Sequence, residues 1–270
     1  MVNTEKKVFG FSSAALHVMA MLFMLLDHMW ATVLSFDWMT CVGRLAFPIF
    51  AFLIVEGFTH TADLKKYMLR MLAFAVISEI PFDLMFGGSL FYPFHQNVLW
   101  SFLIALAGMR LMEKARSRHK LWLSITVCTA VCIIGTVMGY VIFADYYGAG
   151  VLTVFVFYFF NRRNEENAVS YIWKKGSIRN IKTLWTVICL VGQIVCLYFI
   201  NVEMLGGLYY TVELFGLKIE LFQQGLAILA LFPIWLYNGK QGYNAKWFKY
   251  FKYAFYPAHC LILALAAMFG

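Results

Sequence analysis

Long apolar stretches of this 270-residue chain contain six ionisable side chains that stand out: Asp27, His28, Arg44, Glu56, Glu79 and Asp83. An ionisable group in hydrocarbon costs at least ~2.5–3.5 kcal/mol, so such groups usually face the interior of a helical bundle and mark a site. Histidine is the side chain best suited to exchange a proton near neutral pH. A histidine among carboxylates therefore indicates a polar chamber in which proton transfer occurs. The alternative is a buried ion-pair cluster that only fixes the register of the helices.

The elements that must position these residues are membrane-spanning helices. Hydrophobic residues make up 62% of the chain and charged residues 13%, about half the charged share of a soluble protein. The apolar stretches are long enough to cross ~30 Å of hydrocarbon. We expect an all-α transmembrane helical bundle, a single domain over residues 1–270, with about nine spans, or ten. The expected spans are 13–35, 41–58, 67–87, 96–113, 121–142, 148–160, 184–200, 221–237 and 253–269.

The positive residues lie between these stretches. A net charge of +8 would suit a nucleic acid, but a cytoplasmic N-terminus would place twenty of the 22 Lys and Arg in cytoplasmic segments. Lys218 would lie in an outer loop, and Arg44 lies within a span. Because cytoplasmic loops of membrane proteins are rich in Lys and Arg, we predict a cytoplasmic N-terminus. Membrane lipid, and no nucleic acid, is the expected partner.

The buried charges are expected to share one depth. At ~1.5 Å per residue from the cytoplasmic start of each span, Asp27 lies ~21 Å deep, Glu79 ~18 Å and Asp83 ~24 Å. Arg44 enters from the other side, within ~5 Å of the outer edge. Glu79 and Asp83 are i,i+4 neighbours that cannot both be ionised cheaply in low dielectric. Either one of them is protonated or a cation offsets them, and Arg44 is the candidate cation at that depth.

Further polar residues lie near the ends of the expected spans, where structural roles compete with functional ones. Glu56 and His60 form an i,i+4 pair at a cytoplasmic end, which suits an interfacial ion pair as well as a cofactor contact. Asp145 and Tyr146 precede two glycines and indicate a turn at the outer edge. Asn97 begins a span and is expected to cap it.

His259 and the cysteines favour structural readings. His259 would lie ~9 Å from the cytoplasmic face, two residues after Pro257. The six cysteines lie within or at the edge of apolar stretches without a C-x-x-C pair, so we expect them to pack and expect no metal. The sequence also lacks a P-loop, an H-E-x-x-H helix and a G-x-S-x-G elbow.

Several short motifs resemble the TraX family. They are Met24–His28 (MLLDH), Gly43–Gly57 (GRLAFPIFAFLIVEG), Ile77–Leu84 (ISEIPFDL), Asn97–Val98, Tyr237–Gly239 (YNG) and Phe255–His259 (FYPAH). The resemblance runs along nearly the whole chain and is most specific between residues 20 and 100. The family takes its name from the enzyme that acetylates the N-terminus of F-type pilin subunits. It is similar to membrane acyltransferases that carry a histidine in the first span.

The resemblance implies an acetyltransferase in the bacterial cytoplasmic membrane. It would use cytoplasmic acetyl-CoA and an acceptor of unknown identity on the outer side: a pilin-like protein, a peptide, a glycan or a small molecule. The implied base is His28. Asp27 lies ~100° around the helix and is not expected to orient that ring, so Glu79 or Asp83 is expected to do so. Arg44 would neutralise the carboxylates or stabilise the oxyanion.

Seven further residues are expected to bind the substrate or the cofactor: Glu56, His60, Asn97, Asp145, Tyr146, Tyr256 and His259. Two other functions compete with the acyltransferase: a proton-coupled small-molecule transporter and a non-catalytic assembly protein. The transporter is disfavoured because the buried charges crowd into the first three spans, whereas transporters often have two related halves.

Overall fold

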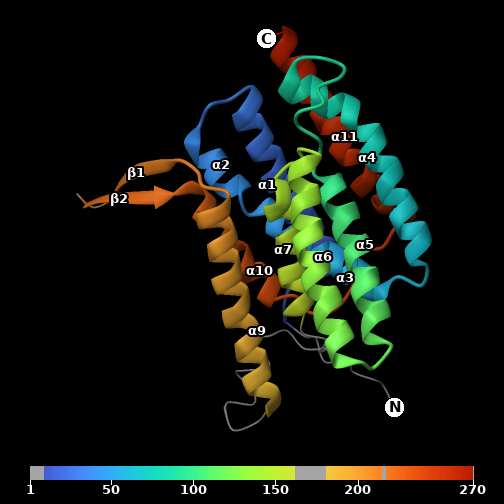
Figure 1. Cartoon of the computed structure of the whole chain (residues 1–270). Coiled ribbons are helices and arrows are strands. Elements are labelled where there is room, and N and C mark those ends of the chain that lie inside the picture. The colour runs from blue at the N-terminus through green and yellow to red at the C-terminus, as the bar shows by residue number, and fades with distance from the viewer. Residues whose placement is uncertain (1–8, 162–180, 215–216, 270) are drawn as a thin grey trace, which may run out of the picture.

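The computed structural model describes residues 9–161, 181–214 and 217–269 (Figure 1). Taking α2 with α3, α9 with η1 and η2 with α10, these residues form nine helical segments and one β-hairpin. The elements are α1 (Ser13–Thr32), α2 (Asp37–Gly43), α3 (Ala46–His60), α4 (Leu64–Gly87), α5 (Leu99–Arg116), α6 (Leu121–Val141), α7 (Tyr147–Phe159), α9 (Ile181–Tyr198), η1 (Phe199–Met204), β1 (Tyr209–Leu214), β2 (Leu217–Phe222), η2 (Gln223–Ala230), α10 (Leu231–Trp235) and α11 (Lys246–Phe269). The predicted helical bundle is confirmed.

The helices have the length and surface of membrane spans. Among the described residues, five stretches are long and apolar enough to cross a membrane: Ser13–Thr32, Asp37–His60, Leu121–Val141, Lys182–Met204 and Lys246–Phe269. Two shorter apolar helices, Tyr147–Phe159 and Gln223–Trp235, pack among them, and α4 and α5 carry more charges. Large apolar side chains on α6 and α9 face outward, including Trp122, Ile133 and Trp185. Such a surface requires lipid as its solvent.

Positive side chains gather at one end of this bundle, where α1, α4, α6 and α11 begin. We call this the basic end and the opposite one the distal end; Figure 1 shows the basic end at the bottom. Residues Lys6, Lys7, Arg162, Arg163, Lys174, Lys175 and Arg179 lie outside the described residues. The described ones at this end include Lys65, Lys66, Lys114, Arg116, Arg118, Lys120, Lys240, Lys246 and Lys249.

The centre of the bundle is built around α3 and α7. In α7 every residue from 148 to 151 and from 153 to 158 is buried. Close approach of α6 and α7 depends on small residues, because a Cβ at Gly139 would lie 2.6 Å from the Tyr147 carbonyl oxygen. Small residues let membrane helices pack backbone to backbone. Together α3 and α7 form the interior against which α1 and α5 pack, whereas α11 packs on α1 and α4.

The second predicted span is broken between α2 and α3, at Arg44 and Leu45. Gly43 ends α2 against α1, and a Cβ at this glycine would lie 2.9 Å from the Asp27 Cα. Only glycine therefore permits this contact. Pro48 lies in the first turn of α3, where its missing N–H leaves no helical bond unmade. The break directs the Arg44 side chain at α1.

The first helix is anchored at the basic end by the loop that precedes α11. Ser12 caps α1 by accepting a hydrogen bond from the Ala15 N–H, at 3.3 Å. The Ser13 N–H donates to the Lys240 carbonyl at 2.9 Å, and the side chain of Asn238 donates to the Gly10 carbonyl at 3.1 Å. The motif Tyr237–Gly239 therefore acts as a strap over the start of α1.

The last helix begins at Lys246, seven residues before the predicted start at 253. The sequence from Lys246 to Lys252 is basic and aromatic and resembled a loop, yet lysine stems lie along apolar surface while their ammonium groups stay in water. The longer helix places His259 ~20 Å from its first residue, not ~9 Å from the basic face. His28 lies ~22 Å along α1, so the two histidines share a level.

The β-hairpin was not predicted. Strands β1 and β2 pair antiparallel, with Tyr209 opposite Phe222 and Leu214 opposite Leu217. In Figure 1 the hairpin projects sideways from the bundle near its distal end. Val212 and Leu214 alternate with polar residues, a period of two that a search for apolar spans does not detect. The hairpin leaves the helical class unchanged.

The contact at Gly43 leads to a first prediction. A Gly43→Ala substitution should push α2 away from α1 and lower the free energy of unfolding by about 1–3 kcal/mol, the usual cost of overpacking. The thermal unfolding midpoint of the purified protein measures this. Gly135→Ala is the matched control, since its Cβ would meet only side-chain atoms, at 3.1 Å or more. Equal midpoints for both variants would show that the close approach is not needed.

Candidate active site

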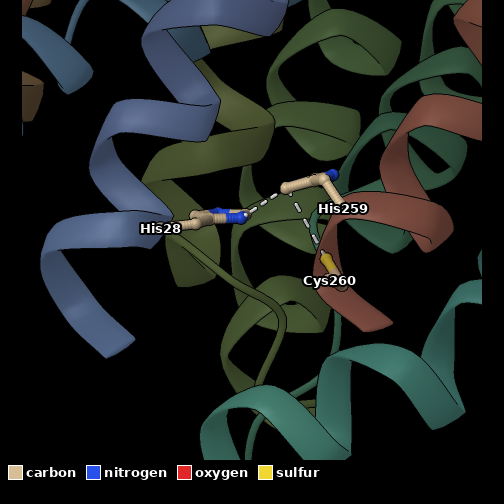
Figure 2. A group of neighbouring side chains, drawn as sticks. All are labelled: His28, His259 and Cys260. Carbon is tan, nitrogen blue, oxygen red and sulfur yellow. Dashed lines mark hydrogen bonds between the residues drawn. The ribbon is translucent and has the colours of Figure 1, made fainter. Parts of the chain in front are cut away.

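The core of the site is a hydrogen-bonded pair of histidines from the first and last helices. His28 Nδ1 and His259 Nε2 lie 2.7 Å apart, and the two rings stack with centroids 4.9 Å apart. Figure 2 shows the pair facing each other, with Cys260 beside His259. Both histidines are buried. Phe86 and Tyr256 contact the His28 ring edge to face, and these contacts help to orient it.

The hydrogen bonds assign the tautomers. His259 Nδ1 lies 2.8 Å from the Phe255 carbonyl oxygen, which can only accept, so this nitrogen carries the proton. Neutral His259 then presents the lone pair of Nε2 to His28. The shared hydrogen therefore belongs to His28 Nδ1, and His28 Nε2 keeps an unprotonated lone pair. A nitrogen in that state can accept a proton from a substrate.

Asp27, adjacent in sequence, faces a different neighbour. Arg44 Nη2 lies 2.7 Å from both carboxylate oxygens of Asp27, and Thr40 donates to the same carboxylate at 2.8 Å. Gln223 in turn donates to the Thr40 hydroxyl, and Gln224 lies 3.5 Å from Arg44 Nη1. The expected ~100° separation of Asp27 from His28 is thus observed: one side chain faces α2 and the other α11.

The carboxylates of α4 are engaged elsewhere, which corrects two expectations. Glu79 accepts from the Trp100 indole at 2.7 Å and from the Asn97 side chain. Asp83 accepts from the Tyr92 backbone N–H at 2.9 Å. Among the described residues no hydrogen bond or ion pair joins either carboxylate to His28 or Arg44. The orienting partner of His28 is His259, and Arg44 offsets Asp27 instead of the α4 pair.

His95, in the loop before α5, links the two groups of charges. Its Nε2 lies 3.4 Å from Asp145, and its ring contacts Phe86, which in turn contacts His28. Burial alone would lower the pKa of His95. The hydrogen bond and charge of Asp145, with the charges of Asp83 and Glu79, outweigh burial and raise the pKa above its ordinary value. The acidic groups around His95 therefore favour its protonated form.

A cavity of about 210 Å³ joins these groups; we call it the distal cavity. His28 and Asp27 line it from α1, and Arg44 lines it from the helix break. Asp145 and Tyr146 close it from the turn before α7. Its other lining residues are Met24, Trp30, Ala31, Gly43, Ala46, Phe47, Phe50, Phe86, His95, Val98, Phe102 and Tyr256. The predicted polar layer is therefore a real cavity, although only part of the predicted set faces it.

A larger cavity of about 370 Å³, the basic-end cavity, lies between α1, α3, α4 and α11. Its mouth carries Lys249 and Lys252 together with the amides Gln241 and Asn244. Farther in, the wall is apolar and includes Met21, Leu53 and Met71. The sequence did not single out this cavity, because its polar residues looked like ordinary loop charges.

The two cavities share part of their walls. Met24, Phe50, Val98, Phe102 and Tyr256 line both. Met24 lies one helical turn from His28 on the same face of α1. A single layer of side chains thus separates a pocket of the basic end from the pocket that holds His28.

Other predicted binding residues take structural positions. Glu56 and His60 form an i,i+4 pair at 3.6 Å at the basic end, outside both cavity walls. Asn97 is fully buried, donates to the Ala75 carbonyl at 2.8 Å, and caps α5 by accepting from the Leu99 N–H. It therefore holds α4 to α5. Tyr146 was expected at the membrane edge but turns inward, stacked on Phe47 with centroids 4.1 Å apart.

Comparison with known proteins shows which family the chain belongs to. The sequence profile described as "TraX protein" matches residues 12–267. The chain belongs to the TraX family. It is also similar to the "Probable fimbrial assembly protein FimC, serogroup H1" of Dichelobacter nodosus, at 28% identity over 272 residues, which cover 96% of this chain and 97% of the relative. No solved structure matches the chain.

The motifs that resemble TraX proteins divide between the cavities and the frame around them. Asp27, His28 and Arg44 line the distal cavity, and Tyr256 lines both cavities. By contrast, Asn97 and the strap Tyr237–Gly239 hold helix ends in place. The TraX resemblance alone could not separate these two roles.

Several residues at the site escaped the sequence analysis. Thr40, Gln223 and Gln224 are buried polar residues that extend the Asp27–Arg44 pair. Two adjacent glutamines at the start of an apolar span were a usable signal, because unpaired amides are costly in lipid. Cys260 lies 3.7 Å from His259 Nε2 and carried no signal apart from its position next to that histidine.

The Asp27–Arg44 pair leads to a second prediction. Arg44→Leu should strand a buried carboxylate and lower the free energy of unfolding by roughly 3 kcal/mol. Thermal unfolding and the yield of monodisperse protein measure the loss. The double variant Asp27→Asn with Arg44→Leu should recover much of it, because no unpaired charge remains. An Arg44→Leu protein as stable as the parent would contradict the structural role and leave only a direct role in chemistry.

Proposed function

We propose that the protein is a membrane-embedded acetyltransferase that moves an acetyl group from cytoplasmic acetyl-CoA to an amine or hydroxyl acceptor on the outer side. The basic end is then cytoplasmic, as the distribution of Lys and Arg predicts, and the membrane is the cytoplasmic membrane of a bacterium. The observation that carries the proposal is that the two cavities share a wall, and that one of them is lined by His28, whose Nε2 keeps a lone pair.

The basic-end cavity suits the donor. Acetyl-CoA has an anionic nucleotide head and a long, largely uncharged arm that ends in the thioester. Lys249, Lys252 and the amides of Gln241 and Asn244 supply charge and hydrogen bonds at the mouth for the phosphates. The apolar interior suits the arm, so the thioester would arrive at the shared wall, one turn from His28.

The distal cavity suits the acceptor and the chemistry. His28 Nε2 takes the proton from the acceptor nitrogen or oxygen as that atom attacks the thioester carbonyl carbon. A carbon–nitrogen or carbon–oxygen bond forms and the carbon–sulfur bond breaks. The leaving CoA thiolate then takes the proton from His28, which returns the imidazole to its neutral state. His259 holds the ring and stabilises the transient imidazolium through the shared hydrogen.

Arg44 is the donor we assign to the developing oxyanion. Its Nη2 is committed to Asp27, but its buried Nε has no hydrogen-bond partner among the described residues. A preoriented cation in a water-poor site stabilises negative charge that appears only in the transition state. Asp27 would then serve mainly to hold the guanidinium in position.

The acceptor is best sought among surface proteins. The family takes its name from a pilin acetylase, and the similar Dichelobacter nodosus protein is named for fimbrial assembly. Both favour the N-terminal amine of a pilin or fimbrial subunit as the first acceptor to test. Other peptides, glycans and small molecules are then tested as acceptors in the same assay.

The third prediction tests the base. His28→Ala should lower acetyl transfer by about 10²–10⁴-fold, the usual contribution of a general base, while the protein still folds. Purified protein in lipid nanodiscs is given radiolabelled acetyl-CoA and a pilin N-terminal peptide, and both free CoA thiol and labelled peptide are counted. His119→Asn, an exposed loop histidine with φ of 54°, is the matched control.

Two results of that assay would count against the proposal. Unchanged transfer by the His28→Ala protein would remove the proposed base. Proton-coupled uptake of a solute by vesicles that contain the protein, with no thioester turnover for any acceptor, would favour the transporter. Turnover that appears only with the distal face accessible to the acceptor would support the proposed direction.

The fourth prediction tests the donor cavity. Lys249→Ala with Lys252→Ala should raise the KM for acetyl-CoA by roughly tenfold or more, since losing ~1.4 kcal/mol of binding is a tenfold effect. The value of kcat should change little, because both lysines lie far from the reacting carbon. Lys114→Ala with Lys120→Ala removes the same charge from the same end but outside the cavity, and should leave KM unchanged. Equal effects of the two pairs would indicate only a general surface attraction.

A further inference from the structure

Three metal-binding atoms converge at the centre of the site. His28 Nδ1, His259 Nε2 and Cys260 Sγ all lie within 4.8 Å of one another. All three residues are buried, and the cysteine has no exposed surface. Figure 2 shows the three side chains gathered between α1 and α11. Two imidazoles and a thiol form a donor set that zinc and other soft or borderline metals prefer.

Two of the three separations between these atoms can be compared with those of a tetrahedral site. An ion at ~2.05 Å from each nitrogen and ~2.3 Å from sulfur would separate a nitrogen from the sulfur by about 3.6 Å and two nitrogens by about 3.4 Å. His259 Nε2 and Cys260 Sγ are already 3.7 Å apart. The two histidine nitrogens, at 2.7 Å, need to separate by about 0.7 Å, which a small rotation of either ring provides.

The surroundings of His259 match those of a metal ligand. Metal-binding histidines almost always donate their second ring nitrogen to a carbonyl or carboxylate, which fixes the tautomer. His259 Nδ1 donates to the Phe255 carbonyl in this way, at 2.8 Å. Its Nε2 lone pair therefore points at the place where the ion would lie, whether a proton or a metal occupies it.

We propose that His28, His259 and Cys260 form a binding site for Zn²⁺, in which the ion takes the place of the hydrogen shared by the histidines. The Cys260 thiol releases its proton to solvent, and the His28 proton moves from Nδ1 to Nε2. Access is from the distal cavity, which His28 lines. Water from that cavity completes the tetrahedron.

Zinc at this site would switch off the transferase. With its Nδ1 on the ion and its proton on Nε2, His28 has no lone pair left to accept a proton from the acceptor. Zn²⁺ is thus a reversible inhibitor that competes with the catalytic tautomer of His28. The inhibition rests on the proposed function; the binding site itself does not.

Binding is tested without reference to activity. The full chain in nanodiscs is titrated with Co²⁺, which reports tetrahedral thiolate coordination by its visible and near-ultraviolet absorption. We expect saturation at one equivalent, displacement by Zn²⁺ and no displacement by Mg²⁺. Cys260→Ser should abolish the thiolate band and weaken binding at least roughly tenfold, whereas Cys41→Ser, the matched control, should keep both. Cys260→Ala serves as a second variant if the serine protein does not fold.

The absence of a cobalt band in the parent protein, or a band unchanged in Cys260→Ser and Cys260→Ala, overturns the site. The inhibition is tested in the acetyl-transfer assay with added Zn²⁺. We expect loss of transfer in the parent, recovery with EDTA, and at least tenfold lower zinc sensitivity in Cys260→Ser, measured relative to that variant's own rate without zinc. Equal zinc sensitivity of the parent and Cys260→Ser overturns the inhibition. If no acceptor is acetylated under any condition, the proposed function fails, and the cobalt titration still decides the site.

Discussion

The hydrogen bond between His28 and His259 is the interaction on which the arrangement of the site depends. It joins the first and last helices of the chain, 231 residues apart, inside a bundle where water does not compete for either nitrogen. α1 and α11 both line the basic-end cavity, and Tyr256 of α11 and Met24 of α1 belong to the shared wall. A change in the histidine pair therefore changes the tautomer of His28 and the shape of both cavities together.

Two adjacent residues in one turn of α1, Asp27 and His28, contact different neighbouring helices. Asp27 faces α2, where Gly43 allows close contact and the helix break delivers Arg44. His28 faces α11 because the next residue of a helix points ~100° away. The adjacent pair in the sequence thus anchors two opposite walls of one cavity. The ion pair fixes α1 against α2, and the histidine pair joins the same turn of α1 to α11.

The amino-acid sequence predicts the positions of the helices better than it predicts which polar side chains pair between them. Lipid requires long apolar helices, so the spans and the positive end follow from composition and charge. The i,i+4 relation of Glu79 and Asp83 was equally readable, but their partners, Trp100 and the Tyr92 N–H, come from other segments. His259 was misplaced because the basic, aromatic start of α11 resembles a loop. The pairing of His28 with His259 depends on that helix start and on three-dimensional packing, which no local pattern records.

Under the proposed function, the shared wall must let an acetyl group pass while it holds CoA back. Phe50, Phe102 and Tyr256 are large and well packed, whereas Met24 is unbranched and can change rotamer at little cost. Met24 lies about 6 Å along α1 from His28, within reach of a thioester at the inner end of the basic-end cavity. Rotation of this one side chain would join the cavities through an opening suited to a two-carbon acyl group, while the aromatic residues hold back the arm and the acceptor. The direction of transfer would then follow from which cavity each substrate can enter.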